Sequence, residues 1–187
     1  MIDACPDSAV LFFDVDGTLT FFDPDDMTDK DFSAVRPSRS AIEAFHRLRD
    51  AGHKAFICTG RPLWLIADSL RALEPAGIVA MAGATLEVEG RVVHEDCFDE
   101  DVIAELARRI SVAGGEALFE TNGATYSLEP VGVEQSFLLG AGVVHSVEEM
   151  RVDGRLRVGK VCLNAPNLAR VANDDGFIER NFELCNT

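Results

Sequence analysis

Residues 10–20 read VLFFDVDGTLT, an apolar run that ends in two acidic residues and is followed at once by glycine and threonine. Because side chains alternate along a strand, Asp14 and Asp16 are expected on the same face at its carboxyl end. Two like charges held so close are costly unless a cation or a shared proton offsets their repulsion. The pair therefore predicts a divalent-metal site in which one carboxylate is also free to react.

The size and charge of the chain limit the classes of protein to which it can belong. Its 187 residues, 47% of them hydrophobic, are enough for one sizeable core, or for a core and a small second lobe. The formal net charge of −15 argues against nucleic acid or an anionic membrane as a partner, because both repel an acidic surface. A small anionic substrate remains compatible with this charge if local cations or backbone N–H groups offset the field.

Cysteine usage and the N-terminal residues indicate a cellular compartment. The five cysteines are dispersed and form no C-x-x-C pair, which fits reduced thiols better than a disulfide framework or a zinc site. The first residues carry neither the basic start nor the long apolar run of a leader, and no segment is long enough to span a membrane. We expect a soluble cytoplasmic protein.

The first third of the chain alternates between strand and helix patterns. Residues 10–15 form a continuous apolar run, which is typical of a central parallel strand buried on both faces. After an irregular, aspartate-rich loop, the pattern predicts a helix to residue 50 capped by Ser38 or Ser40, a strand at 54–60, a helix at 62–73 and a strand at 77–82. This order implies right-handed crossovers and a parallel, Rossmann-like sheet, the α/β class.

The pattern changes after residue 83. A β-hairpin is predicted at residues 84–93, and an amphipathic helix with Asp99 as its cap extends to residue 112. Strands follow within 117–128 and at 158–163, and a short helix at 164–172. We therefore expect a core domain at residues 1–83 and an inserted α+β domain at residues 84–187.

The segment FFDVDGTLT, residues 12–20, resembles motif I of the haloacid dehalogenase-like (HAD) superfamily, most of whose members are phosphohydrolases. The resemblance implies that Asp14 is a carboxylate nucleophile that forms an aspartyl-phosphate, and that Asp16 is the general acid and base. Gly17 would permit the sharp turn that presents backbone N–H groups to the phosphate. Mg²⁺ would be the cofactor, held by Asp14 and by the backbone carbonyl of Asp16.

The segment FICTGRP, residues 56–62, resembles motif II of the same superfamily. There the hydroxyl of Thr59, together with Gly60, would bind the transferring phosphoryl group, although in isolation these two residues could merely end a strand. Thr-Gly-Arg is the form typical of the Cof-type branch, whose members carry an α+β cap. For Arg61 two interpretations remain open: it contacts the substrate, or it is a solvated residue at the start of a helix.

Residues 81–93 resemble the Cof-type segment at which the core chain departs for the cap. Ala82 stands where that family usually has asparagine, so one common feature is lost. The resemblance implies a cap that closes over the active site and chooses the substrate. Residues 120–124 and 139–142 are candidate substrate-facing loops, and ordinary turns are the alternative interpretation.

The superfamily also needs a lysine and a late acidic motif, and here the chain departs from the family pattern. Lys160 is the candidate for the catalytic lysine, although its position resembles a cap strand at least as well. Asp174 and Asp175 are the late acids that could imitate the fourth motif, which completes the Mg²⁺ site. No apolar strand directly precedes them, so a polar turn is the better account of this pair.

We therefore expect the chain to end within the cap, before the returning core segment of the family. Without that segment, the strand at residues 10–15 would be an exposed apolar edge, which invites pairing with another chain and hence a homo-oligomer. The metal would also lose a carboxylate ligand, which would lower metal affinity and turnover.

These observations predict a Mg²⁺-dependent phosphohydrolase that acts on a small phosphorylated metabolite, such as a sugar phosphate. The alternative is a truncated or degenerate member that binds a phosphate ligand or a partner chain without efficient turnover. A phosphomutase-like transferase with the same aspartyl-phosphate would differ only in its acceptor, which the sequence does not identify.

Overall fold

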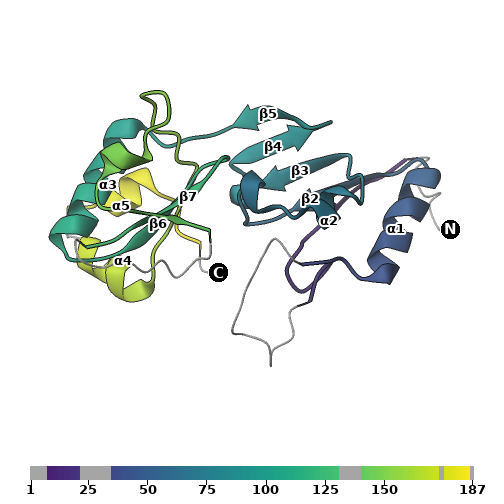
Figure 1. The fold of residues 1–187 in the computed structure, drawn as a ribbon, viewed down its shortest axis with the longest axis horizontal. Helices are drawn as coiled ribbons and strands as arrows, with labels where there is room; N and C mark the ends of the chain where they lie inside the picture. Colours follow the sequence, from purple (N-terminus) through teal and green to yellow (C-terminus); the bar gives the residue numbers. More distant parts are fainter. Residues whose placement is uncertain (1–7, 22–34, 131–139, 173–174, 186–187) are drawn as a thin grey trace. The chain divides into compact units, whose positions relative to one another are not determined.

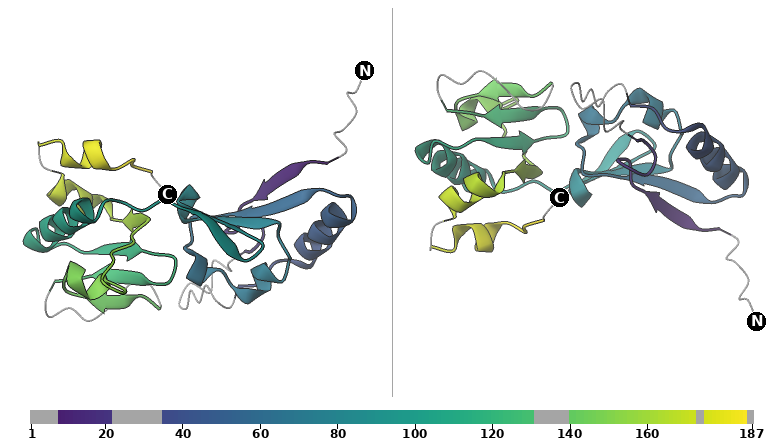
Figure 2. Two further views of the ribbon diagram at one scale, coloured as in Figure 1. Left: turned by 90° about the horizontal axis from the view of Figure 1, so that it is seen from above. Right: turned by 90° about the horizontal axis from the view of Figure 1, so that it is seen from below.

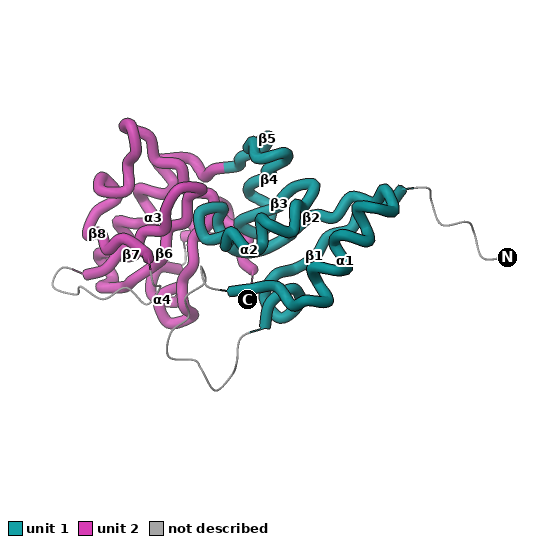
Figure 3. Tube along the Cα trace, turned by 45° about the vertical axis from the view of Figure 1, so that its right-hand side comes forward, with its two compact units in different colours: residues 1–96 teal, residues 97–187 magenta. Residues whose placement is uncertain are grey.

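The computed structural model describes residues 8–21, 35–130, 140–172 and 175–185. The chain divides into two compact units, Met1–Asp96 (unit 1) and Cys97–Thr187 (unit 2), which Figure 3 shows in different colours. Each unit has its own cluster of buried apolar side chains, and no residue belongs to both clusters. The fold therefore contains two separate hydrophobic cores.

Unit 1 is built on a five-stranded sheet in the order β1-β2-β3-β4-β5. Its strands are β1 (Val10–Phe13), β2 (Lys54–Cys58), β3 (Gly77–Ala80), β4 (Thr85–Val88) and β5 (Arg91–Glu95). The first three strands are parallel, whereas the β4–β5 hairpin is antiparallel to β3. The predicted α/β class is confirmed, and the hairpin makes the sheet a mixed one.

Two helices lie on the same side of this sheet, α1 (Arg39–Asp50) and α2 (Asp68–Arg71) (Figure 2). The predicted cap of α1 is Ser38, whose hydroxyl accepts the Ala41 N–H at 3.1 Å. Between the helices and the sheet lie buried side chains that include Phe45, Ile57, Leu70 and Ile78. This layer is the core of unit 1.

The helix predicted at residues 62–73 is wrong in its extent. A 3₁₀ turn, Leu63–Leu65, comes first, and Ile66 and Ala67 then adopt extended conformations before the short helix α2 begins. Both residues are buried in the core, and the Ser69 hydroxyl donates to the Val35 carbonyl at 2.5 Å. The apolar residues at 62–73 have the spacing of one helix, but they form a bent segment whose buried side chains still face the core.

Strand β1 lies at the edge of the sheet: the apolar run alone predicted a central strand, whereas the family resemblance without its returning core segment predicted this exposed edge. Among the described residues it pairs with β2 alone, and Val10 and Phe12 are 58% and 59% exposed. The Phe12 ring packs against the Phe56 ring at a centroid distance of 5.3 Å. Space for Phe56 comes from Gly77, where an added Cβ would approach the Phe56 ring to 2.6 Å. The face of β1 opposite the helices is consequently apolar and half-open to solvent.

Unit 2 is an α+β unit, as predicted. The strands β6 (Ala117–Glu120), β7 (Thr125–Leu128), β8 (Gly142–Val144) and β9 (Lys160–Cys162) form a sheet in the order β8-β7-β6-β9. Its helices are α3 (Glu100–Val112), α4 (Ala165–Val171) and α5 (Phe177–Asn181), drawn in teal and yellow in Figure 1. In the part of the chain that is described, no helix has the length and apolar character needed to cross a bilayer.

The core of unit 2 lies on one face of its sheet. Buried side chains of α3, among them Ile103 and Leu106, pack with Phe119 and Leu128 of the strands. Helix α3 begins as predicted, because the Asp99 carboxylate accepts the Asp101 N–H at 2.9 Å. The local start signal and the apolar face together determine where this helix lies.

The two units divide after Asp96, whereas the sequence predicted a domain boundary after residue 83. The reason is the register of the hairpin, since β4 pairs with β3 from Thr85 opposite Ala80 to Val88 opposite Gly77. These backbone hydrogen bonds make the hairpin a continuation of the unit 1 sheet, and the chain leaves that sheet only after β5.

Candidate functional site

The acidic pair lies directly after β1. Asp14 and Asp16 are exposed, and Val15 between them is fully buried. This alternation is the one expected when a strand places both acids on the same face. Within the described part of the chain, no donor is hydrogen-bonded to the Asp14 carboxylate. Asp14 therefore presents a solvent-accessible carboxylate at the carboxyl end of its strand.

A tight turn holds the backbone around Asp16. The Val15 carbonyl accepts the N–H groups of Leu19 and Thr20, both at 3.0 Å. Gly17 has a φ of +82°, the left-handed conformation that glycine adopts without steric cost, so the predicted sharp turn is present. The Gly17 N–H donates to the Thr20 carbonyl at 2.8 Å, so this group closes the turn in the structure.

Thr59 follows β2 and is almost fully buried. Its N–H donates to the Val79 carbonyl at 2.9 Å, which continues the pairing of β2 with β3. Since β1 and β2 are parallel and Phe13 lies opposite Ile57, the chain reaches Asp14 and Thr59 at the same edge of the sheet. Ligands of open parallel sheets bind at this carboxyl edge. Topology thus brings the two predicted motifs together, with Gly60 directly after Thr59.

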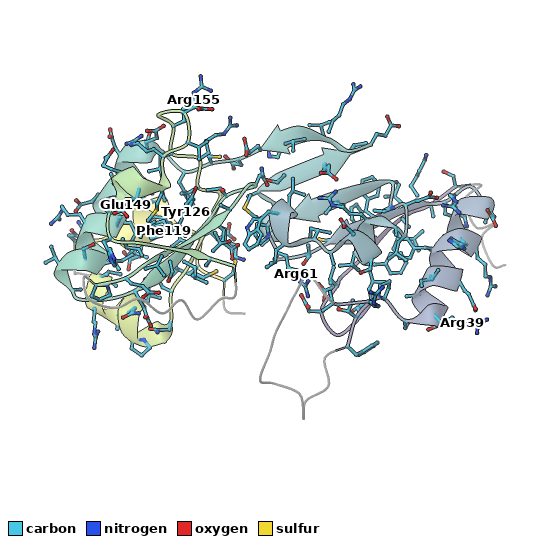
Figure 4. The ribbon with its side chains drawn as sticks, in the orientation of Figure 1. Arg39, Arg61, Phe119, Tyr126, Glu149 and Arg155 are labelled. Atoms are coloured by element: carbon cyan, nitrogen blue, oxygen red, sulfur yellow. The ribbon has the colours of Figure 1, made fainter. Side chains whose placement is uncertain are left out.

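Arg61 forms a two-point ion pair with Asp16, a role that neither interpretation from the sequence included. Its Nε donates to Asp16 Oδ2 at 3.0 Å and its Nη2 donates to Oδ1 at 2.5 Å. The Arg61 side chain is only 5% exposed, whereas that of Asp16 is 42% exposed. Figure 4 shows Arg61 near the turn that follows β1. No signal in the sequence identifies this pair, because the strand register determines which residues meet.

The turn after β3 is hydrogen-bonded to the backbone of motif II. It spans Met81–Gly83, and Met81 and Ala82 both have left-handed φ values, +49° and +55°. The Met81 N–H donates to the Arg61 carbonyl at 2.9 Å, and the Ala82 N–H donates to the Thr59 carbonyl at 3.1 Å. Asparagine adopts this conformation more readily than alanine, which gives the substitution noted at Ala82 a structural meaning.

The acidic pair offers oxygen ligands of the kind that a hard cation prefers, but it offers few of them. Among the described residues, no three histidine, cysteine, aspartate or glutamate side chains converge as a metal group. Mg²⁺ prefers oxygen ligands and keeps several waters, so one carboxylate and one carbonyl can hold it. The Asp14 carboxylate and the Asp16 carbonyl fit that description, whereas the Asp16 carboxylate is bound by Arg61.

Lys160 lies in unit 2, on strand β9. Its Nζ is 2.8 Å from Glu120 Oε2, and the two residues are directly opposite each other in the β6–β9 pairing. The Glu120 side chain is almost fully buried, so the lysine supplies its counter-charge. Lys160 therefore lies in a strand of unit 2, which is the position expected if it belongs to a cap strand.

Asp175 lies two residues before the first residue of helix α5, and Asp174 lies outside the described residues. The Asp175 carboxylate accepts the Phe177 N–H at 3.0 Å and forms a two-point ion pair with Arg109, at 2.7 and 3.1 Å. The hydrogen bonds from Arg109, followed by that from Phe177, lower the pKa of Asp175 to about 2. The polar turn preferred from the sequence accounts for this residue.

The two candidate loops of unit 2 are described in part. Residues 120–124 connect β6 to β7 in a tight turn, in which the Thr121 N–H and hydroxyl both donate to the Ala124 carbonyl at 2.9 Å. In the other loop, Leu139 lies outside the described residues and Gly142 begins β8. The first loop thus has the internal hydrogen bonds of an ordinary turn.

Comparison with known proteins relates this chain to a family of hydrolases. The family model described as haloacid dehalogenase-like hydrolase matches residues 11–167. No curated protein sequence matches the chain.

Solved structures give the same fold. A protein described as a member of a phosphoryl-transfer superfamily is 23% identical, with a TM-score of 0.63 over 87% of this chain and 61% of its own. A HAD subclass IIB sugar phosphatase is 26% identical, with a TM-score of 0.55 over 76% and 54%. A HAD phosphatase from Bacteroides thetaiotaomicron is 22% identical, with a TM-score of 0.58 over 80% and 54%.

The chain thus spans between about half and three-fifths of the length of these structures. The family match covers most of the chain and includes both motifs at the carboxyl edge of the unit 1 sheet. The chain belongs to the haloacid dehalogenase-like hydrolase family.

Proposed function

We propose that the protein is a Mg²⁺-dependent phosphohydrolase that cleaves small phosphorylated metabolites of the sugar-phosphate type. The observation that carries this proposal is the Asp14 carboxylate, which is exposed at the carboxyl end of β1, beside Asp16 and at the same sheet edge as Thr59. Family membership supports phosphoryl transfer, and the likeness to a sugar phosphatase supports the substrate class.

In the proposed reaction, an Asp14 carboxylate oxygen attacks phosphorus while the bond from phosphorus to the substrate oxygen breaks. Asp16, which must take up a proton before this step, gives that proton to the leaving oxygen, which departs as an alcohol. Asp16 then takes a proton from a water molecule whose oxygen attacks the same phosphorus, and the bond to Asp14 breaks to release phosphate. Bound Mg²⁺ would neutralise charge between the Asp14 carboxylate and the phosphoryl oxygens.

Hydrolysis of p-nitrophenyl phosphate by the 187-residue chain tests this proposal. We expect turnover that requires Mg²⁺ and that falls by at least about 10³-fold in Asp14→Asn, because the amide is a poor nucleophile. Asp50→Asn is the matched control, since Asp50 is an exposed aspartate at the end of α1. If the wild type shows no Mg²⁺-dependent turnover above background, the enzyme proposal is wrong for this chain.

A second candidate is a member that binds phosphate without efficient turnover. It is favoured by the small set of metal donors, since the described residues offer no third acidic ligand beside Asp14 and Asp16. Calorimetric binding of inorganic phosphate, weakened in Thr59→Val, together with absent turnover, would support this candidate. Transfer of phosphate from p-nitrophenyl phosphate to an added alcohol, in place of water, would instead identify the transferase.

A further inference from the structure

The ion pair between Arg61 and Asp16 joins the two motifs of the site. Two guanidinium contacts fall on the Asp16 carboxylate, one on each oxygen, at 3.0 and 2.5 Å. A planar guanidinium that makes two parallel hydrogen bonds fixes the plane of a carboxylate as well as its position. The orientation of Asp16 is therefore determined by Arg61.

Arg61 and Asp16 both belong to turns whose backbone is held by hydrogen bonds. The Arg61 N–H donates to the Thr59 hydroxyl at 3.2 Å, and the Arg61 carbonyl accepts the Met81 N–H at 2.9 Å. On the other side, the turn closed by Gly17 and Thr20 holds the backbone of Asp16. Burial of Arg61 also restricts its side chain, since only 5% of it is exposed. The pair is thus a rigid link between the two turns.

The geometry leaves one side of the carboxylate available. Each carboxylate oxygen has two lone pairs, and Arg61 uses one on each. The Asp16 side chain is 42% exposed, so its remaining lone pairs can reach a bound substrate or water. We propose that Arg61 is a positioning residue that orients Asp16 for proton transfer to the leaving oxygen; this inference rests on the proposed phosphohydrolase function.

The leaving group of the substrate provides the first test. The p-nitrophenolate ion is stable without a proton, whereas an alkoxide needs one as it departs. We expect Arg61→Gln to lower kcat/KM for a simple alkyl phosphate by roughly 10²–10³-fold, and for p-nitrophenyl phosphate by less than about 10-fold. Arg61→Lys should recover little of the alkyl activity, because an ammonium group cannot reproduce the two-point contact.

A double-mutant cycle with Asp16→Asn provides the second test. If Arg61 acts through Asp16, its loss should cost less than about 3-fold further in kcat/KM for the alkyl phosphate once Asp16 is already replaced. Additive losses in the double variant would overturn the proposal. An equal rise in KM for both substrates, with kcat unchanged, would show that Arg61 contacts the phosphate and would overturn it as well.

Arg71→Gln is the matched control for loss of an arginine from unit 1. Arg71 pairs with Glu87 at 2.6 Å and its Nη2 donates to the Leu63 carbonyl at 3.3 Å; neither partner is an acid of motif I, so its replacement should leave the alkyl-to-aryl ratio unchanged. If thermal melts show that Arg61→Gln is unfolded at the assay temperature, Arg61→Lys and its double variant with Asp16→Asn carry the same comparison. An unchanged ratio in the folded Arg61 variants contradicts the positioning role alone. If the wild type shows no turnover that depends on Asp14, the proposed phosphohydrolase function is contradicted.

Discussion

A single arginine in unit 2, Arg109, binds two carboxylates that lie far apart in the sequence. Its Nε is 2.7 Å from Glu105 on the same helix, and its Nη2 is 2.7 Å from Asp175 just before α5. The guanidinium also lies over the Phe177 ring, 4.2 Å from the centroid. Hydrogen bonds from Arg108 and Arg109 lower the pKa of Glu105 to about 2, and Asp175 has a similar value. The junction of α3 and α5 therefore depends on two ionised acids.

This junction predicts a loss of stability in acid. A carboxyl group whose pKa is lower in the folded state stabilises the fold above its unfolded value, which is near 4 for aspartate. That contribution disappears as the pH falls from about 5 towards 2. We expect the thermal midpoint of unit 2 to fall over this range, and to fall less steeply in Asp175→Asn, which should already be less stable at pH 6. Circular dichroism melts measure both quantities.

Glu183→Gln is the control for this comparison, since Glu183 is exposed near the end of the described chain. Its pH dependence should match that of the wild type. An equally steep acid loss in Asp175→Asn and in the wild type would show that Asp175 does not contribute to the stability of the junction.

At the scale of an element, the 3₁₀ turn Met81–Gly83 is held in an unfavourable conformation. Left-handed backbone costs an ordinary L-residue roughly 1–2 kcal/mol, and two such residues follow each other here. The turn keeps this conformation because its N–H groups bind the carbonyls of Thr59 and Arg61. The turn that is bonded to motif II therefore lowers the free energy of unfolding of unit 1.

Replacing Ala82 by asparagine should recover part of this energy. Asparagine tolerates the left-handed conformation, and the site is exposed, so its side chain has room. We expect Ala82→Asn to stabilise unit 1 by roughly 0.5–1 kcal/mol, or a few degrees in thermal midpoint. Ala72→Asn is the matched control, because Ala72 has an ordinary φ of −67° and asparagine there relieves no left-handed conformation. A lower midpoint in Ala82→Asn would contradict the account of strain.

Elements with local signals could be predicted from the sequence, and those that depend on distant contacts could not. Ser38 and Asp99 cap α1 and α3 as expected, because a cap needs only a side chain and the next turn of backbone. The bent segment at Ile66 and Ala67 was missed, since apolar spacing does not show that the core takes both residues in extended form. The pairing of Arg61 with Asp16 was missed for the same reason, as it requires the β1–β2 register.

At the scale of the whole molecule, the two hydrophobic cores make each unit a candidate for independent unfolding. The chain has one tryptophan and one tyrosine, and Trp64 lies in unit 1 whereas Tyr126 lies in unit 2. Each unit therefore carries its own optical reporter. The homo-oligomer predicted through the exposed β1 edge stays a prediction.

We expect Leu70→Ala to destabilise unit 1 by about 2–5 kcal/mol, because it leaves a cavity at a fully buried position. Trp64 fluorescence should then show unfolding at lower denaturant. A tryptophan placed by Tyr126→Trp in a Trp64→Phe background should report an unchanged transition for unit 2. Leu106→Ala, in the core of unit 2, is the reciprocal control. A shift of both reporters by either substitution would show that the two units unfold together.

The pairing of β1 with β2 has a consequence for the chain while it is being synthesised. Its neighbouring residue Ala9 donates its N–H to His53 Nδ1, and the two residues are 44 positions apart. At ordinary rates of chain synthesis, an interval of that length corresponds to about 2–9 s. Throughout that interval the apolar VLFF strand has been made but its β2 partner has not. A newly made chain therefore carries an unpaired aromatic strand for seconds, and more chaperone should protect it where a more stable folded state would not.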